Sequence, residues 1–227
     1  MSTGVSVVIP VFNGALYLGA AIESVLAQTR AADAIIVVDD GSTDETAAVA
    51  SRYGAKVQCL RRPHEGAAAA RNTGHAVVKS PLLAFLDADD LWLPQKLEWQ
   101  IPLIANAKKP NVIFGHTERF VSPDLSEEER TLLRWDPGPV AGPCCSSMLM
   151  RNSAFASLGG FNSSLQVGEF LEWFARAQKA EFQCVTIPEV VFRRRLHKNN
   201  MGRSHTNSRA NFARTMKAVL DIKRASP

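Results

Sequence analysis

The chain has 227 residues, and its 26 Lys and Arg against 22 Asp and Glu give a net charge of +4. Hydrophobic residues make up 46% and charged residues 21%, which is typical of a folded globular protein and excludes a disordered or fibrous chain. The sequence has neither an apolar run of about 18 residues nor a basic and then apolar leader, so we expect one cytoplasmic domain without a membrane span or signal peptide.

The first half of the chain alternates short apolar runs with helical patterns. Apolar strands separated by helices predict a parallel sheet covered on both faces, so the expected fold class is doubly wound α/β. Strands are predicted at residues 5–9, where Pro10 ends the strand, and at 35–38, 57–60 and 82–86. Helices are predicted at 43–53, with Ser42 or Thr43 as cap, and at 66–78. An earlier helix is predicted from the apolar stripe of Leu16, Ile22, Val25 and Leu26.

The second half is less regular, and its stretch at 122–143 has the charged, Pro- and Gly-rich composition of loops. Helices are predicted at about 95–107, 168–179 and 207–224, strands at 112–114 and 146–150, and extended segments at 182–187 and 190–194.

Polar clusters follow the predicted strands at residues 10–13, 39–44 and 87–90. Ligands of such sheets bind beyond the carboxyl ends of the strands, so we expect these clusters to converge on one site. Asp87 and Asp89 are two residues apart and can point to the same side, where their oxygens suit Mg²⁺ or Mn²⁺ and, through it, a phosphate. The alternative is that Asp89 or Asp90 caps a following helix.

Two further segments carry candidate ligand contacts. The run from Asp39 to Asp44 offers acceptors for a uracil-type imide or for ribose hydroxyls, although it also suits a turn and helix cap. Gly66 opens a helix whose four alanines precede Arg71 and Asn72, which permits close approach to a ligand or simply close packing.

Five ordered motifs in residues 5–100 resemble the pattern of glycosyltransferase family 2, which has the GT-A fold. Two weaker motifs of the second half, Gly159–Asn162 and Arg194–His197, extend the resemblance over nearly the whole chain. The five motifs are Val8–Asn13, Ser24–Thr29, Val37–Asp44, Gly66 with Ala70–Asn72, and Phe85–Asp90.

The resemblance implies transfer of a hexose-type sugar, with inversion, from a nucleotide-diphospho-sugar, most simply a UDP-sugar, and a divalent cation, Mg²⁺ or Mn²⁺. We expect a nucleotide-sugar-binding half at 1–110, an acceptor-side half at 111–206 and a basic C-terminal helix at 207–227. Carried over by position, the nucleotide-sugar contacts are Pro10, Val11, Phe12, Asn13, Asp39, Asp40, Gly66, Arg71, Asp87 and Ala88, and the metal ligands are Asp89, Asp87 and His197. For His197, a salt-bridged surface strand is the alternative.

An inverting transfer needs a carboxylate that takes the proton of the acceptor hydroxyl. Family members carry Glu-Asp before a Trp-containing helix, whereas this chain has Phe170 where that Asp would align. Glu169 and Glu172 share a helix face and are the candidate bases, with Glu169 favoured. The alternative is that they only stabilise the helix start and the surface.

Two other functions compete with this interpretation. The first is a non-catalytic sugar or nucleotide binder, which fits the Phe170 that stands in place of the catalytic Asp. The second is a metal-dependent phosphoryl-transfer enzyme, which also places Asp-x-Asp at a strand end. The latter usually has a Thr after the pair, where this chain has Leu91.

The C-terminal region is basic, with ten Lys or Arg in residues 191–227 against Asp221 alone. Such a tail suits nucleic acid, anionic lipid headgroups or a phosphorylated substrate, and the alternative is a solvated helix face. Phe212, Met216, Val219 and Leu220 have roughly helical spacing, which predicts contact with the inner face of a membrane or packing on the core or on a second subunit. We expect a saccharide or lipid-linked acceptor and no nucleic-acid partner.

Overall fold

The computed structural model describes residues 3–105, 110–133, 138–198, 200 and 208–225. Its centre is a mixed sheet in the order β3-β2-β1-β4-β7-β6-β8-β5. The strands are β1 (Val5–Val11), β2 (Ala34–Asp39), β3 (Gln58–Arg61), β4 (Leu82–Phe85), β5 (Leu91–Trp92), β6 (Val112–Val121), β7 (Leu149–Arg151) and β8 (Cys184–Leu196).

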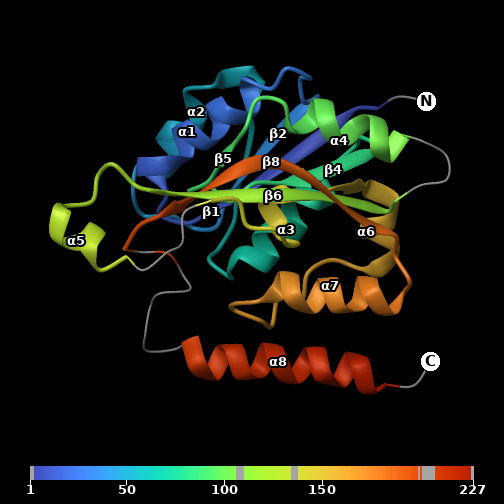
Figure 1. The fold of residues 1–227 in the computed structure, drawn as a ribbon. Coiled ribbons are helices and arrows are strands. Elements are labelled where there is room, and N and C mark those ends of the chain that lie inside the picture. Colours follow the sequence, from blue (N-terminus) through green and yellow to red (C-terminus); the bar gives the residue numbers. More distant parts are fainter. Residues whose placement is uncertain (1–2, 106–109, 134–137, 199, 201–207, 226–227) are drawn as a thin grey trace.

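Helices cover both faces of the sheet (Figure 1). They are α1 (Ala15–Leu26), α2 (Thr46–Ser51), α3 (Ala67–Ala76), α4 (Lys96–Ala105), α5 (Glu127–Thr131), α6 (Asn152–Leu158), α7 (Glu169–Lys179) and α8 (Ser208–Arg224), with 3-10 turns at Gly54–Lys56 and Cys145–Ser147.

Alternation along β1 explains the two layers. Val7 and Ile9 belong to the core cluster that contains α1 and α4, whereas Val8 belongs to the cluster on the other face, with α3, α6 and α7. All seven residues of β1 are buried, as expected for a strand with helices on both sides. The predicted α/β class is confirmed.

The sheet is parallel in its first half and mixed in its second. β1 pairs in parallel with β2 and β4, and β2 pairs in parallel with β3. The short β7 runs antiparallel to both β4 and β6, so it joins the two halves into one sheet. The carboxyl ends of β1, β2 and β4 therefore lie together at one edge.

Several sequence predictions of the first half need correction. β1 continues through Pro10 to Val11, since Pro10 still pairs in register with Val38. The second helix begins only at Thr46, and neither Ser42 nor Thr43 caps it; its N-cap is Glu45, without a side-chain bond. No helix follows Asp90 directly, because β5 comes next, so the helix-cap interpretation of Asp89 and Asp90 is wrong.

In the second half the strands differ in length from the prediction. The strand expected at 112–114 extends to Val121, and the two extended segments after residue 182 form the single strand β8. The strand expected at 146–150 begins at Leu149, after a 3-10 turn, and the expected loop at 122–143 contains α5. α6 was not predicted. The predicted helix ends at 106–107 and at 207 lie outside the described residues.

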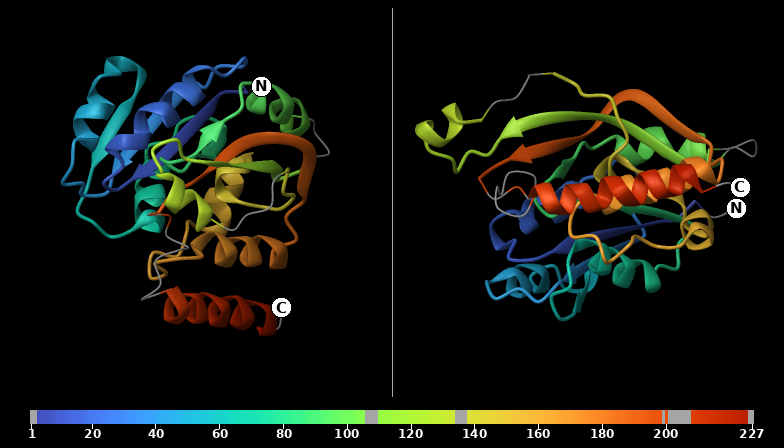
Figure 2. Two further views of the ribbon diagram at one scale, coloured as in Figure 1. Left: turned by 60° about the vertical axis from the view of Figure 1, so that its left-hand side comes forward. Right: turned by 90° about the horizontal axis from the view of Figure 1, so that it is seen from below.

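The outermost helix, α8, lies against α7 (Figure 2). Its Thr215 is buried and donates to the carbonyl oxygen of Val167 over 2.6 Å. Gly168, with φ of 78°, forms the N-cap of α7 at this contact; a Cβ there would lie 3.0 Å from Oγ1 of Thr215. α8 thus packs beside the N-terminal end of α7, where Glu169 is located.

Candidate functional site

The loops that follow β1 and β2 are joined by reciprocal hydrogen bonds. The amide of Asn13 donates to Oγ of Ser42 over 2.9 Å, and the amide of Thr43 donates to Oδ1 of Asn13 over 2.8 Å. Pro10 and Val11 are buried within β1, whereas Phe12 and Asn13 are exposed. Of the four predicted base-pocket residues, only the last two are therefore exposed.

Asp39 and Asp40 are both buried, but they have different partners. The Asp40 carboxylate accepts hydrogen bonds from the amides of Glu65 and Gly66, the latter over 2.7 Å, and pairs with Arg62 at 3.0 Å. It thereby fixes Gly66, the N-cap of α3, whose φ of 96° suits glycine.

Asp39 uses only one of its carboxylate oxygens in this way. Its Oδ1 accepts from the amide of Ser42 over 2.8 Å and closes the turn. Oδ2 is buried and has no hydrogen-bond donor among the described residues, although Nε of Arg61 lies 3.7 Å away. Asp39 therefore retains acceptor capacity at this edge of the sheet.

Arg71 connects the loop after β4 with the start of α7. Its Nη2 lies 2.6 Å from Oδ1 of Asp87, and its Nη1 lies 2.5 Å from Oε1 of Glu169. The Arg71 side chain is only 4% exposed, so one buried cation pairs with both carboxylates. The structure thus brings together three predicted site residues from different parts of the chain.

The neighbouring Asn72 holds the glycine-rich turn before α7. Its side chain accepts from the amide of Phe161 over 2.9 Å and donates to the carbonyl oxygen of the same residue over 2.8 Å. A Cβ at Gly160 would lie 2.5 Å from Oδ1 of Asn72, so glycine is required for this approach. Two motifs recognised separately in the sequence therefore contact each other.

Asp89 and His197, both predicted metal ligands, are in direct contact. Oδ2 of Asp89 lies 2.9 Å from Nε2 of His197 and 3.3 Å from Nδ2 of Asn200. Arg195 donates from Nε to the carbonyl oxygen of Asp89 over 2.9 Å. Asn200 was not predicted from the sequence, and Arg195 was predicted only as part of the motif Arg194–His197.

The Asp89–His197 pair fits a divalent cation in donor type and spacing. Adjacent ligand atoms of an octahedral ion with bonds of about 2.1 Å lie about 3 Å apart. Oδ2 of Asp89 and Nε2 of His197 lie 2.9 Å apart, which is close to that distance. Within the described part of the chain, no group of three His, Cys, Asp or Glu side chains is arranged to hold a metal. Asp87 is instead paired with Arg71, so phosphate oxygens and water would have to complete the coordination.

Asp90 is the last residue of the acidic loop, residues 87–90, and it stabilises this loop through buried hydrogen bonds. It is buried, and it accepts from Oγ of Ser146 over 3.0 Å and from the amide of Arg195 over 3.1 Å. Burial raises the pKa of Asp90 well above its usual value, and the adjacent Asp89 and Asp87 raise it further. Oγ of Ser146 is also 3.1 Å from the amide of Asp87, so Ser146 supports the whole acidic loop. Ala88, between the aspartates, lies beside Gly14.

The two candidate bases differ clearly in their environments. Glu169 is buried and pairs with Arg71, whose other end pairs with Asp87. Glu172 binds Arg176 with both oxygens, at 2.9 and 3.0 Å, and Arg176 in turn donates to the carbonyl oxygens of Leu158 and Gly160. Phe170 packs against the rings of Phe114, Trp173 and Phe174. Of these three side chains, only Glu169 is linked to Asp87 through Arg71, while Glu172 and Phe170 stabilise the fold.

Lys96, a buried lysine of α4, contacts the turn that carries Ser146, and it was not predicted from the sequence. Nζ of Lys96 lies 2.5 Å from Oε1 of Gln100 and 3.3 Å from the carbonyl oxygens of Ser147 and Met148, with the Trp92 ring 4.4 Å away. Burial lowers the pKa of Lys96 to about 7. These contacts fix the turn that carries Ser146.

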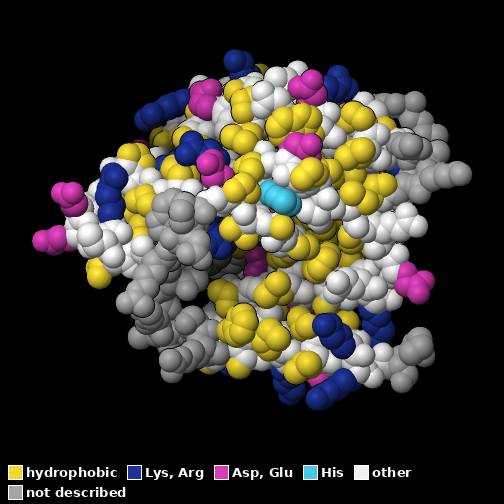
Figure 3. Space-filling view, in the orientation of Figure 1, with side chains coloured by type: hydrophobic (Ala, Val, Ile, Leu, Met, Phe, Trp, Pro, Cys, Tyr) yellow, Lys and Arg dark blue, Asp and Glu magenta, His cyan; other side chains and the backbone are white. Residues whose placement is uncertain are grey.

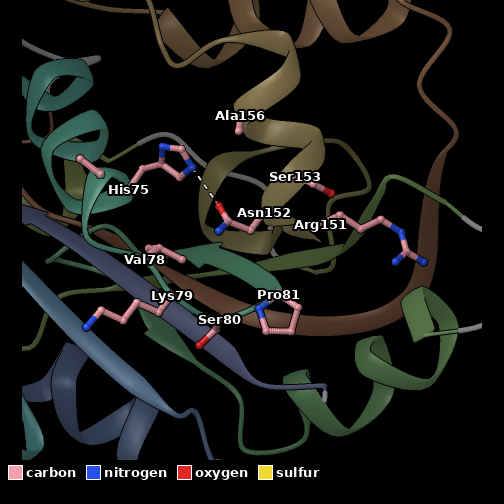
Figure 4. A pocket seen from close by; sticks show the side chains of 10 residues that line it. His75, Val78, Lys79, Ser80, Pro81, Arg151, Asn152, Ser153 and Ala156 are labelled. Atoms are coloured by element: carbon pink, nitrogen blue, oxygen red, sulfur yellow. Dashed lines mark hydrogen bonds between the residues drawn. The ribbon is translucent and has the colours of Figure 1, made fainter. Parts of the chain in front are cut away.

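A hollow of about 550 Å³ lies away from these residues, between the end of α3 and the start of α6. There Nε2 of His75 lies 2.9 Å from Oδ1 of Asn152 (Figure 4). The cationic ends of Lys79 and Arg151 point in opposite directions, and Arg151 is bound to the carbonyl oxygen of Ile104. The hollow shares no residue with the cluster at the ends of β1, β2 and β4.

Comparison with known proteins adds an independent line of evidence. The family model described as glycosyl transferase family 2 matches residues 6–159. The chain is 33% identical over 187 residues to an uncharacterized glycosyltransferase of Rickettsia felis, covering 75% of this chain and 31% of the relative. It is 32% identical over 208 residues to uncharacterized glycosyltransferase RT0329 of Rickettsia typhi, covering 85% of this chain and 64% of the relative.

A relative whose name gives a specific reaction matches a shorter part of the chain. The UDP-Glc:alpha-D-GlcNAc-diphosphoundecaprenol beta-1,3-glucosyltransferase WfaP of Escherichia coli is 33% identical over 123 residues, which are 53% of this chain and 48% of the relative. The chain thus spans less than two thirds of the length of these three relatives. The S. aureus TarS 1–349 structure in complex with UDP-GlcNAc superposes with a TM-score of 0.78 at 16% identity, covering 96% of this chain and 66% of TarS 1–349, which shows a shared fold.

Proposed function

This chain belongs to glycosyl transferase family 2, and on that basis we propose that it transfers a sugar from a nucleotide-diphospho-sugar, with uridine as the nucleoside, to an acceptor hydroxyl. The observation that carries the proposal is the Arg71 bridge between Asp87, on the loop after β4, and Glu169, at the start of α7. It places a carboxylate of the second half beside the acidic loop of the first half.

We assign the base and diphosphate end of the donor to the loops after β1, β2 and β4. Phe12 offers a partly exposed aromatic ring, and Oδ2 of Asp39 is an acceptor without a donor among the described residues. Asp40 remains a candidate base contact, although its oxygens already bind the amides of Glu65 and Gly66. In this assignment residues 1–110 bind the donor and 111–206 form the acceptor side.

Asp89 and His197 would hold Mg²⁺ or Mn²⁺, while Asp87 stays paired with Arg71. The ion would neutralise negative charge on the departing diphosphate. Arg195, which binds the carbonyl oxygen of Asp89, and Asn200, which binds its carboxylate, keep the Asp89 side chain oriented toward His197. An ion bound by both side chains would replace the hydrogen bond between Oδ2 of Asp89 and Nε2 of His197.

Glu169 is the proposed general base. In an inverting displacement a carboxylate removes the proton from the acceptor hydroxyl on the face opposite the leaving group. The Arg71 guanidinium pairs with Oε1 of Glu169 and fixes the orientation of this carboxylate. Glu172 is unsuited to the role because Arg176 occupies both of its oxygens.

A lipid-linked saccharide is the acceptor class that we propose. WfaP, by its name, acts on a diphosphoundecaprenol-linked sugar, and α8 presents exposed Phe212, Met216 and Leu220 along one face. Exposed basic residues lie beside them, so hydrophobic and cationic side chains are intermixed over α8 (Figure 3). No helix in the described part of the chain is long and apolar enough to cross a membrane. The intermixed hydrophobic and cationic side chains of α8 support contact with the surface of the bilayer.

The proposal is tested by measuring nucleoside diphosphate released from a panel of UDP- and GDP-sugars, with Mg²⁺ or Mn²⁺ and with EDTA, in the presence of saccharide and lipid-linked acceptors. We expect release that depends on both acceptor and metal, and loss of that release in Asp89→Ala. Full activity of Asp89→Ala would contradict the metal assignment. Tight binding of UDP without turnover on any acceptor would favour a non-catalytic binder.

A further inference from the structure

The exposed ring of Phe12 is already covered by another aromatic side chain. The imidazole of His64 stacks on it with 3.9 Å between ring centroids and 26° between the ring planes. Stacked rings in contact lie at about this separation, so the covered face of Phe12 has no room for a nucleobase.

Two features hold His64 in this position. Nδ1 of the imidazole lies 2.9 Å from Oδ2 of Asp40 and 3.1 Å from the carbonyl oxygen of Asp40. Gly41, with φ of 81°, lets the backbone of residue 64 pass close by, because a Cβ there would be 2.9 Å from the amide nitrogen of His64. The His64 side chain is nevertheless 54% exposed, so it can rotate into solvent without disturbing the core.

We propose that His64 determines nucleotide affinity by competing with the donor base for the face of the Phe12 ring on which the imidazole stacks. This inference rests on the proposed function, which places the base at Phe12. For the base to bind, the imidazole swings away and gives up both its ring contact and its bond to Asp40. The swing also vacates one acceptor position on Oδ2 of Asp40, which the base can then use.

The size of the effect follows from the contacts that His64 loses. An aromatic pair contributes a free energy that corresponds to a change of about two- to tenfold in a dissociation constant. Removing the imidazole therefore tightens binding of a nucleotide by about two- to tenfold. It leaves binding of a ligand that has phosphates but no base unchanged, because Phe12 contacts only the base.

The experiment is calorimetric titration of UDP and of inorganic pyrophosphate, each with Mn²⁺, into the unmodified chain and into the variants His64→Ala, His64→Asn and Phe12→Ala. His64→Asn keeps a polar group near Asp40 but removes the ring. We expect tighter UDP binding in both His64 variants, weaker UDP binding in Phe12→Ala and the same pyrophosphate binding in all four proteins.

A second readout uses the unmodified chain and does not depend on how the variants fold. The ring protons of His64 are shielded by Phe12, so their NMR signals should move toward solvent-exposed values as UDP is added. Equal or weaker UDP binding in the His64 variants, or unmoved His64 signals in the presence of bound UDP, would overturn this inference and leave the proposed function intact. Absence of UDP binding to both the unmodified chain and His64→Ala would overturn both.

Discussion

Nη1 of Arg71 and Oε1 of Glu169 lie 2.5 Å apart, although the two residues are 98 positions apart in the chain. The other end of the guanidinium contacts Asp87 at 2.6 Å. One buried cation therefore links the acidic loop of the first half to the proposed base of the second. The geometry of the proposed donor and acceptor sides depends on the same side chain.

The role of Glu169 is tested by Glu169→Gln, which keeps the shape of the side chain and removes its basicity. We expect kcat to fall by about 10²- to 10⁴-fold, the usual contribution of a general base, because the amide cannot take the acceptor proton. Affinity for UDP should be nearly unchanged. Turnover assays and calorimetry measure the two quantities.

Glu172→Gln is the matched control, one helical turn further along α7. This substitution weakens the clamp on Arg176 and so loosens the turn at Gly159 and Gly160. We expect the free energy of unfolding to fall by about 1–3 kcal/mol, while the folded protein keeps its turnover. Loss of turnover in Glu172→Gln with retention in Glu169→Gln would reverse the assignment of the base.

The Arg71 bridge predicts a specific coupling between substitutions. Arg71→Met leaves buried Glu169 without its partner, which should reduce the free energy of unfolding by about 3–5 kcal/mol. Adding Glu169→Gln removes the unpaired charge and should restore part of that stability. Denaturant unfolding of the single and double variants measures the coupling, and strictly additive effects would show that the two groups do not interact.

Much of the first half of the fold could be predicted because its signals are local. Val5–Val11 and Ala34–Asp39 are apolar throughout, so both faces of each strand must be buried. The second half gave weaker signals. β6 becomes polar after Gly115, and its register with β8 shifts at His116, so the strand beyond Phe114 resembles a loop in sequence.

The site also contains residues that local sequence signals reveal and residues that only long-range contacts bring into place. Asp87 and Asp89 are conspicuous because they directly follow a buried strand. By contrast, only the family resemblance linked Asp89 with His197, which is 108 positions away, and no sequence pattern indicated the contact of Asp89 with Asn200 over 111 positions. The role of Lys96 is equally non-local, because its acceptors lie on the turn before Met148 and its position in α4 looks like that of an ordinary surface lysine.

Lys96 predicts a dependence of stability on pH. Burial lowers its pKa to about 7 in the folded protein, whereas an unfolded lysine titrates near 10.4. Between these values the unfolded chain binds more protons, so this residue makes the free energy of unfolding rise as the pH increases from about 7 to 10. Below pH 7 both states are protonated and its contribution no longer changes.

The measurement is urea unfolding at several pH values for the unmodified protein and for Lys96→Met. Other groups titrate in the same range, so the difference between the two proteins is the informative quantity. We expect the stability of the unmodified protein relative to Lys96→Met to increase between pH 7 and 10. A difference that is independent of pH would show that Lys96 has an ordinary pKa.

The surface of α8 predicts association with anionic membranes. Phe212 is 53% exposed and Leu220 is 44% exposed, and Lys217 and Arg214 are exposed on the same helix. We expect the protein to float with vesicles that contain phosphatidylglycerol, and to do so less at high salt because the charge attraction is screened. The double variant Phe212→Ser, Leu220→Ser should lose most of this binding.

Leu132→Ser provides the control, since Leu132 is 80% exposed but does not lie on α8. It should bind vesicles like the unmodified protein. Equal flotation of all three proteins would exclude α8 as the membrane contact, and dimerisation that is lost only in the α8 variant would instead indicate contact with a second subunit.

The most direct test of the donor site is a crystal structure of the protein with UDP and Mn²⁺, in which the anomalous signal locates the metal. We expect one manganese within about 2.3 Å of the Asp89 carboxylate and of Nε2 of His197, bridged to the diphosphate, with the uracil against Phe12. UDP or manganese bound elsewhere, with the Asp89–His197 contact unchanged, would contradict the assignment of this cluster as the nucleotide-sugar site.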